Sequence, residues 1–252
     1  ISYPRFMIEQ SVTANGDLFS HELGHHWWGD LVAPTIHNHM WIKEGPAEYS
    51  SHLFVEYKDG HEAFVDLVKD NQQFVLEECH IQDEGFHPLS PMPDAQIYGR
   101  TTYYKGASIH HNLRAYLGDE LYRSACQSVI STHFDSHMDA EVFRLTLEDV
   151  TGLDLDPFFD AQIYQPGFST WLIDSTITEI GAGGDGFETT LYLNQKLRAC
   201  ANFHENEPLD VTLWNAEWDT TLVEVRVGGE YDEVTISHPE PYVLIALNAD
   251  GK

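Results

Sequence analysis

The chain has 252 residues, which is enough for one large domain or two smaller ones. Hydrophobic residues make up 42% of the chain and charged residues 21%, and these ordinary fractions exclude the disordered and collagen-like classes. The net charge is −28, and acidic residues outnumber basic ones on both sides of residue 170. Because binding to phosphates requires a basic surface, we expect no nucleic-acid partner. We also expect no membrane span, since no apolar run approaches the ~18 residues that a transmembrane helix needs.

The first 170 residues have the apolar spacing of helices. The first predicted helix, 17–29, has Asp17 as its N-cap and Gly29 as its end. The pair Trp27 and Trp28 near its end is expected to pack in the core. A proline-rich loop at 88–93 interrupts the helical pattern and is expected on the surface near a site. The further predicted helices are 41–57, 62–78, 105–117, 120–131 and 140–150.

The pattern changes after Pro166 and Gly167, where short runs of alternating apolar and polar residues replace the helical spacing. Turns rich in glycine, aspartate and proline separate these runs, which is typical of a small antiparallel sandwich. The sequence therefore predicts an α+β chain, with a mostly helical domain over residues 1–170 and a small antiparallel β-sandwich over 171–252. The predicted strands are 189–193, 211–214, 221–227, 233–236 and 242–247.

Residues 21–25 form an HExxH motif within the first predicted helix. Four residues are about one helical turn, so His21 and His25 lie on one face and can share a metal ion. Glu22 lies one residue round the helix, beside the metal and not on it. This is where a general base must lie to take a proton from an activated water molecule.

A third ligand is predicted at Glu44, which follows His25 after 18 residues and lies near the start of the second predicted helix. Two antiparallel helices joined by a loop of that length can direct Glu44 back to His21 and His25. Two imidazoles and one carboxylate leave a fourth tetrahedral position for water, which is typical of a catalytic zinc site. The sequence therefore predicts one zinc ion, held by His21, His25 and Glu44.

These motifs resemble those of one peptidase family. An HExxH motif followed by 18 residues and Glu-Gly is similar to the signature of the gluzincin metallopeptidases. Residues 25–30 resemble the HxWxG(N/D) extension of the aminopeptidase N family, and residues 41–45 resemble its W-L-x-E-G motif. Residues 103–108 resemble its Y-x-K-G-A-S motif. The resemblance is strong over residues 1–170 and weaker over the remainder.

The resemblance implies a thermolysin-like zinc metallopeptidase domain over residues 1–170, followed by the family's small β-domain. It implies that Tyr103, and not Tyr104, donates its phenol to the oxyanion of the tetrahedral intermediate. The chemistry agrees, because charge developing on the carbonyl oxygen needs a fixed donor. Tyr104 is expected to be a packed aromatic side chain. The implied substrates are peptides, and flanking domains of the same polypeptide are expected.

The chain departs from the family at its start. The family carries a Gly-x-Met-Glu-Asn motif upstream of HExxH, and its glutamate holds the free amino group of the substrate. Residues 1–4 resemble only the stretch that follows this motif, so the catalytic domain is expected to be incomplete at its amino-terminal end. Removal of amino-terminal residues is therefore implied by the resemblance alone.

Other histidines and carboxylates around the motif have weaker assignments. Glu48 lies one turn beyond Glu44 and could accept the second ring N–H of a zinc-binding histidine, or it could be an exposed helix carboxylate. His26, His110 and His111 are interpreted as structural or exposed side chains, because adjacent residues on a helix point in different directions.

Three functions are compatible with these residues. The first is a zinc-dependent aminopeptidase in which Glu22 is the general base and Tyr103 stabilises the oxyanion. The second is a thermolysin-like endopeptidase, which shares the three zinc ligands and needs no group for the free amine. The third is a catalytically silent binding module, although a silent module would need neither Glu22 nor Tyr103.

Overall fold

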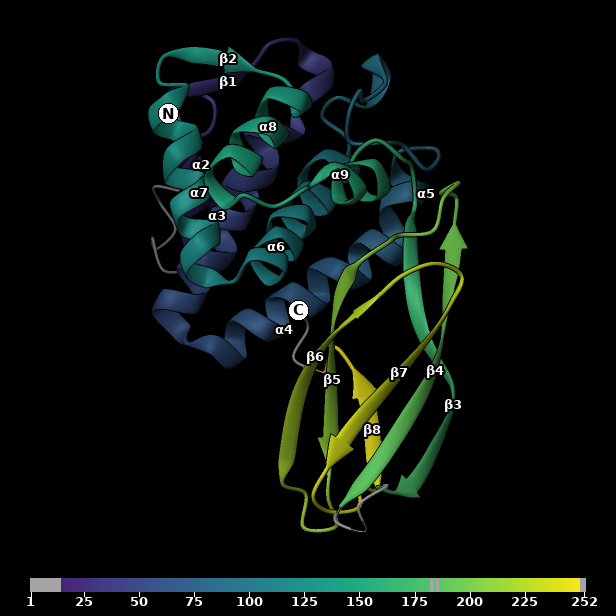
Figure 1. The fold of residues 1–252 in the computed structure, drawn as a ribbon. Helices are drawn as coiled ribbons and strands as arrows, with labels where there is room; N and C mark the ends of the chain where they lie inside the picture. Colours follow the sequence, from purple (N-terminus) through teal and green to yellow (C-terminus); the bar gives the residue numbers. More distant parts are fainter. Residues whose placement is uncertain (1–14, 182–183, 185, 250–252) are drawn as a thin grey trace. The chain divides into compact units, whose positions relative to one another are not determined.

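The computed structural model of the chain describes residues 15–181, 184 and 186–249. The chain forms two compact units, Ile1–Pro166 and Gly167–Lys252 (Figure 1). The first unit is mostly helical and the second is built from antiparallel strands, so the predicted α+β class is confirmed. Among the described residues, no helix has the length and apolar composition that crossing a bilayer requires.

The first unit is built mainly from helices, which are connected by turns and by longer loops such as residues 83–93. Two π-helical turns, η3 (Val75–Cys79) and η5 (Thr101–Lys105), lead into α5 and α6, and η2 (His37–His39) and η4 (Asp94–Gln96) are 3₁₀ turns. The helices are α2 (Gly16–Gly24), α3 (Trp41–Asp59), α4 (His61–Phe74), α5 (His80–Gln82), α6 (Gly106–Leu117), α7 (Asp119–Thr132), α8 (Ala140–Thr151) and α9 (Asp156–Gln162). A short parallel pair joins β1 (Val32–Pro34) to β2 (Ser136–Met138).

Helix α3 is the centre of this unit, because α2, α4 and α6 all pack against it (Figure 1). It ends at Asp59, and the next residue, Gly60, has a φ of 96° and turns the chain directly into α4. The side chains of Trp41 and Tyr49 on α3 are almost fully buried, and they pack with Phe143 and Phe159 in one continuous hydrophobic core. These large aromatic side chains give the unit a rigid interior on which the polar residues of α2 and α3 are supported.

Helix α2 is shorter than the sequence predicts. It ends at Gly24 and not at Gly29, because the carbonyl of Gly24 accepts hydrogen bonds from the backbone N–H groups of the next residues and closes a tight turn. Asp17 lies in the first turn of the helix and is not its N-cap. The expectation for the tryptophan pair is half wrong: Trp28 is buried, whereas Trp27 is 45% exposed. The turn after Gly24 directs these two neighbouring side chains to opposite sides.

The second unit is a sandwich of two three-stranded sheets. One sheet has the order β3-β4-β7 and the other the order β6-β5-β8, and every pairing is antiparallel. Aliphatic side chains of both sheets, such as Leu191 on β4 and Val211 on β5, are fully buried and form a core of their own. The strands are β3 (Phe168–Ile180), β4 (Phe187–Arg198), β5 (Glu207–Trp214), β6 (Thr220–Val227), β7 (Tyr231–His238) and β8 (Leu244–Leu247). Five of these strands overlap the five predicted ones, whereas β3, which begins before residue 171, was not predicted.

Candidate metal centre

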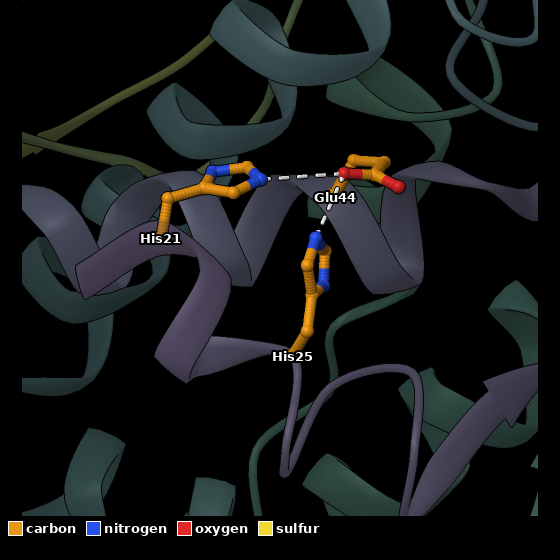
Figure 2. A group of neighbouring side chains, drawn as sticks. All are labelled: His21, His25 and Glu44. Carbon is orange, nitrogen blue, oxygen red and sulfur yellow. Dashed lines mark ion pairs between the residues drawn. The ribbon is translucent and has the colours of Figure 1, made fainter. Parts of the chain in front are cut away.

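The three predicted ligands meet between α2 and α3. His21 and His25 come from α2 and the residue after it, and Glu44 comes from the first turn of α3. The Oε2 atom of Glu44 lies 3.5 Å from Nε2 of His21 and 3.3 Å from Nε2 of His25. Figure 2 shows both rings directed at the Glu44 carboxylate. In the described part of the chain, these residues are the only group of three or more that could hold a metal ion, and their ligand atoms lie within 4.8 Å of one another.

Each imidazole is held by its outer nitrogen. Nδ1 of His21 lies 2.7 Å from Oε2 of Glu48, and Nδ1 of His25 lies 3.0 Å from the carbonyl oxygen of Trp28. Both partners accept hydrogen bonds, so each Nδ1 donates its proton to them and each Nε2, directed at the centre of the group, is the nitrogen that can bind a metal ion in place of a proton. Such outer contacts fix the orientation of histidine ligands in metal sites.

Glycine residues allow the helices of the site to approach closely. A Cβ on Gly24 would lie 3.1 Å from the Cβ of Ser50 on α3, so α2 rests directly on the helix that carries Glu44. A Cβ on Gly45 would lie 2.9 Å from the backbone of Gly106, which begins α6. Glu44 precedes Gly45 and Lys105 precedes Gly106, so this close approach sets Glu44 and Lys105 at a fixed separation. Larger side chains at Gly24 or Gly45 would push the elements of the site apart.

The electrostatic environment of the site favours a cation. Burial lowers the pKa of His21, but its hydrogen bonds with Glu44 and Glu48 outweigh burial and raise the pKa to about 9. Burial raises the pKa of Glu44, but hydrogen bonds with His21 and His25 outweigh it and hold the pKa well below its usual range. Glu44 is therefore ionised and buried, and it requires positive charge beside it.

Tyr103 lies beside His21, and Glu22 follows His21 directly in α2. The ring of Tyr103, in η5, stacks on the ring of His21 with 6.1 Å between the centroids. Burial raises the pKa of the Tyr103 hydroxyl, and the charges of Glu44 and Glu22 raise it further, so the hydroxyl keeps its proton and can donate a hydrogen bond. Tyr104 points elsewhere, because its ring stacks on Phe74 at a centroid distance of 4.3 Å.

The family model for the peptidase family M1 domain matches residues 3–162. The chain belongs to peptidase family M1. Its match contains all the residues of the candidate metal centre and ends before the β-sandwich begins.

Several curated proteins are similar to this M1 chain. Glutamyl aminopeptidase of Bitis rhinoceros is 25% identical over 171 residues, which are 64% of this chain and 18% of that protein. Tricorn protease-interacting factor F2 of Thermoplasma volcanium is 23% identical over 240 residues, which are 92% of this chain and 28% of that protein. The M1 chain therefore spans only 18% to 28% of the length of these relatives.

A solved structure shares the fold of both units. The crystal structure of Legionella pneumophila aminopeptidase A in complex with aspartic acid superposes with a TM-score of 0.71. The superposition covers 93% of this chain and 26% of that chain, at 16% sequence identity. At this identity, the similarity supports the fold and carries no information about individual residues.

Three contacts of the M1 site were not predicted from the sequence. Nζ of Lys43 lies 3.2 Å from Oε1 of Glu44, on the side of the carboxylate away from the histidines. The stem of Lys43 crosses Gly29, where a Cβ would lie 2.8 Å from its Cε atom. The carbonyl of Trp28 has no signal in the sequence, because every residue carries one. Residues 1–4, on which the comparison with the amine-binding motif depends, lie outside the described residues.

Proposed function

We propose that this chain is the catalytic part of a zinc-dependent aminopeptidase, which removes amino-terminal residues from peptides. The observation that carries the proposal is the convergence of His21, His25 and Glu44 beside the hydroxyl-bearing ring of Tyr103. Membership of family M1 supports peptide hydrolysis, and the names of the relatives, such as glutamyl aminopeptidase, support action at the amino terminus. This chain is much shorter than the relatives whose activity we propose that it shares.

The donor set fits zinc. Two neutral imidazole nitrogens and one carboxylate oxygen are the protein ligands of a common class of catalytic zinc site, and they leave further positions for water and substrate. The Nδ1–H groups of His21 and His25 donate hydrogen bonds to Glu48 and to the Trp28 carbonyl, which hold both rings as in metal-binding histidines. A zinc ion at His21, His25 and Glu44 would supply Lewis-acid polarisation of the scissile carbonyl and of the attacking water.

The residues of the chain would then perform the proton transfers. Glu22 accepts a proton from the attacking water and passes it to the nitrogen of the leaving amine. Tyr103 keeps its proton, because burial and the nearby carboxylates raise its pKa, and it donates a hydrogen bond to the carbonyl oxygen as negative charge develops there. Glu48 keeps the ring of His21 in the orientation that directs Nε2 to the metal.

The proposal is tested by digesting one peptide in two forms, with a free and with an acetylated amino terminus, while zinc is measured on the same sample. We expect about one zinc ion per chain and stepwise loss of residues from the free form only. Internal cleavage of both forms would contradict aminopeptidase action and indicate an endopeptidase. If the zinc-loaded chain cleaves neither form, the chain by itself is a binding module and the proposal is wrong.

A further inference from the structure

The helical segment that presents Tyr103 begins on a buried carboxylate from another part of the chain. Asp83 follows α5 and is only 3% exposed. Its Oδ1 accepts a hydrogen bond from the backbone N–H of Arg100, and its Oδ2 accepts one from the N–H of Thr101, both at 2.7 Å. N–H groups at the start of a helix have no partner within the helix, and an ionised carboxylate is a strong acceptor for them. Asp83 thus caps a helix from which it is separated by 17 residues of chain.

The residue before this helix leaves space for the Asp83 carboxylate. A Cβ on Gly99 would lie 2.8 Å from Oδ1, 2.9 Å from Cγ and 2.9 Å from Oδ2 of Asp83. Any side chain at residue 99 would therefore compete with the carboxylate for the same volume. Asp83 and Gly99 together form one capping interaction, which we call the Asp83 cap.

The first turn after the Asp83 cap is the π-helical turn η5, and hydrogen bonds from another helix hold its other end as well. A π-helical turn is rare and is found frequently at functional sites. Nδ2 of Asn71, a buried residue of α4, donates to the carbonyl of Tyr104 at 3.0 Å and to Oγ of Ser108 at 2.8 Å. Tyr103 lies between these two attachments, and its ring stacks on His21.

We propose that Asp83 is a positioning residue for the hydrolysis, which holds the start of η5 so that the phenol of Tyr103 stays at its place over His21. This inference rests on the proposed function of Tyr103. Within the described part of the chain, the hydrogen bonds of the Asp83 carboxylate are to the backbone N–H groups of Arg100 and Thr101. Its effect on the reaction therefore passes through the backbone to Tyr103, two residues beyond Thr101.

The first test compares D83N with a matched cap variant, D139N. Asp139 caps α8 in the same unit, with Oδ1 accepting from the N–H of Val142 at 2.9 Å. Because small displacements of reacting groups are costly, D83N is expected to lower kcat on the order of tenfold or more, at unchanged KM and zinc content. D139N is expected to leave kcat unchanged. Equal kcat values in D83N and in the wild-type chain would overturn the inference.

A second variant, at Gly99, disturbs the Asp83 cap without removing the charge of Asp83. G99A places a methyl group where the carboxylate of Asp83 now lies, so it should displace the carboxylate and lower kcat in the same way as D83N. This variant keeps the test decisive if D83N does not fold.

A double-mutant cycle with Y103F separates positioning from a general loss of order. In a chain that already lacks the Tyr103 hydroxyl, D83N should cause little further loss of kcat, because the group that it positions is absent. An equal loss in both backgrounds would show that Asp83 does not act through Tyr103, and it would overturn the inference.

Amide hydrogen exchange gives a readout that does not depend on activity. D83N should accelerate exchange of the amides in residues 100–104, whereas D139N should accelerate exchange only at the start of α8. Unchanged exchange at residues 100–104 in D83N overturns the role of Asp83 even if the wild-type chain is an active enzyme. A zinc-loaded wild-type chain that hydrolyses no peptide overturns the proposed function instead, whatever the exchange shows.

Discussion

Two groups of histidines lie inside the helical unit, and they differ in their neighbours. His21 and His25 face the carboxylate of Glu44, and hydrogen bonds with carboxylates raise the pKa of His21 to about 9 despite its burial. His52 and His110 face aromatic rings, including that of Tyr49, at centroid distances of 5.9 and 6.4 Å. Burial lowers the pKa of His52 to about 4 and that of His110 to about 3.

The difference shows which histidines of a histidine-rich chain can serve as ligands. A carboxylate beside an imidazole creates a site for positive charge, and the positive charge is a proton or a metal ion. An imidazole among aromatic rings stays neutral, fills space in the core and makes one or two hydrogen bonds. Nδ1 of His110, for example, forms a hydrogen bond with the Tyr122 hydroxyl at 3.0 Å. Hydrogen bonds with carboxylates are present in the first group, whereas the second group is more deeply buried and has no such hydrogen bond among the described residues.

Removal of one imidazole from the first group should have the largest effect. H25A deletes a predicted zinc ligand, so we expect the zinc content to fall to background and peptide hydrolysis to fall by at least about a thousandfold. The control is H26A, because the side chain of His26 is 53% exposed and lies outside the group of three. Metal analysis of both purified variants decides the outcome. An H25A chain with full zinc content would show that the metal is bound elsewhere.

Removal of the charge behind His21 should have an intermediate effect. E48Q keeps an oxygen that can accept the proton of His21 Nδ1, but it removes the negative charge that strengthens this hydrogen bond. Partners of this kind typically contribute ~10- to 100-fold to metal affinity, and we expect zinc affinity to fall within this range. Competition with a chelator of known affinity measures the change. Affinity equal to that of the wild-type chain would mean that Glu48 does not support the ligand.

The low pKa values of His52 and His110 should make the free energy of unfolding depend on pH. Below pH ~6.5 the unfolded chain binds protons at His52 and His110, whereas the folded chain cannot do so until the pH approaches 4 and 3. The free energy of unfolding should therefore fall as the pH decreases from 6.5 to 4.

H110Q removes one of these protons, so the slope of the unfolding free energy against pH should decrease by up to about 1.4 kcal/mol per pH unit in this range. Denaturant unfolding at several pH values measures the slope, and H26Q, at an exposed histidine, should leave it unchanged. A slope that is the same in H110Q and in the wild-type chain would show that His110 is protonated in the folded state.

The proximity of His21, His25 and Glu44 could be predicted from the sequence because it depends on local periodicity and on one spacing. Helical geometry places His21 and His25 on one face, and the 18 intervening residues return the chain to Glu44. The bounds of α3 agreed to within two residues at its end, since its apolar positions recur at helical spacing. The contact between His21 and Glu48 was one of two readings that the sequence left open.

Other features depend on contacts between distant segments and have no local pattern. The end of α2 at Gly24 follows from a tight turn of backbone hydrogen bonds, while Gly29 makes room for Lys43. Asp83 looks like an ordinary loop carboxylate in the sequence, because its partners are backbone N–H groups 17 and 18 residues away. The π-helical turn at η5 likewise depends on Asn71 of α4, which no periodicity connects with it.

We propose that the residues brought together by α2 and α3 bind zinc and hydrolyse peptides with Glu22 as the general base. The most direct test is E22Q, measured for zinc content and for peptide hydrolysis on the same preparation as the wild-type chain. Glutamine has the shape of glutamate but cannot accept the proton, so zinc content should stay at that of the wild-type chain while kcat falls by at least about a hundredfold. An E22Q chain that binds zinc and hydrolyses peptides at the wild-type rate would show that Glu22 is not the general base.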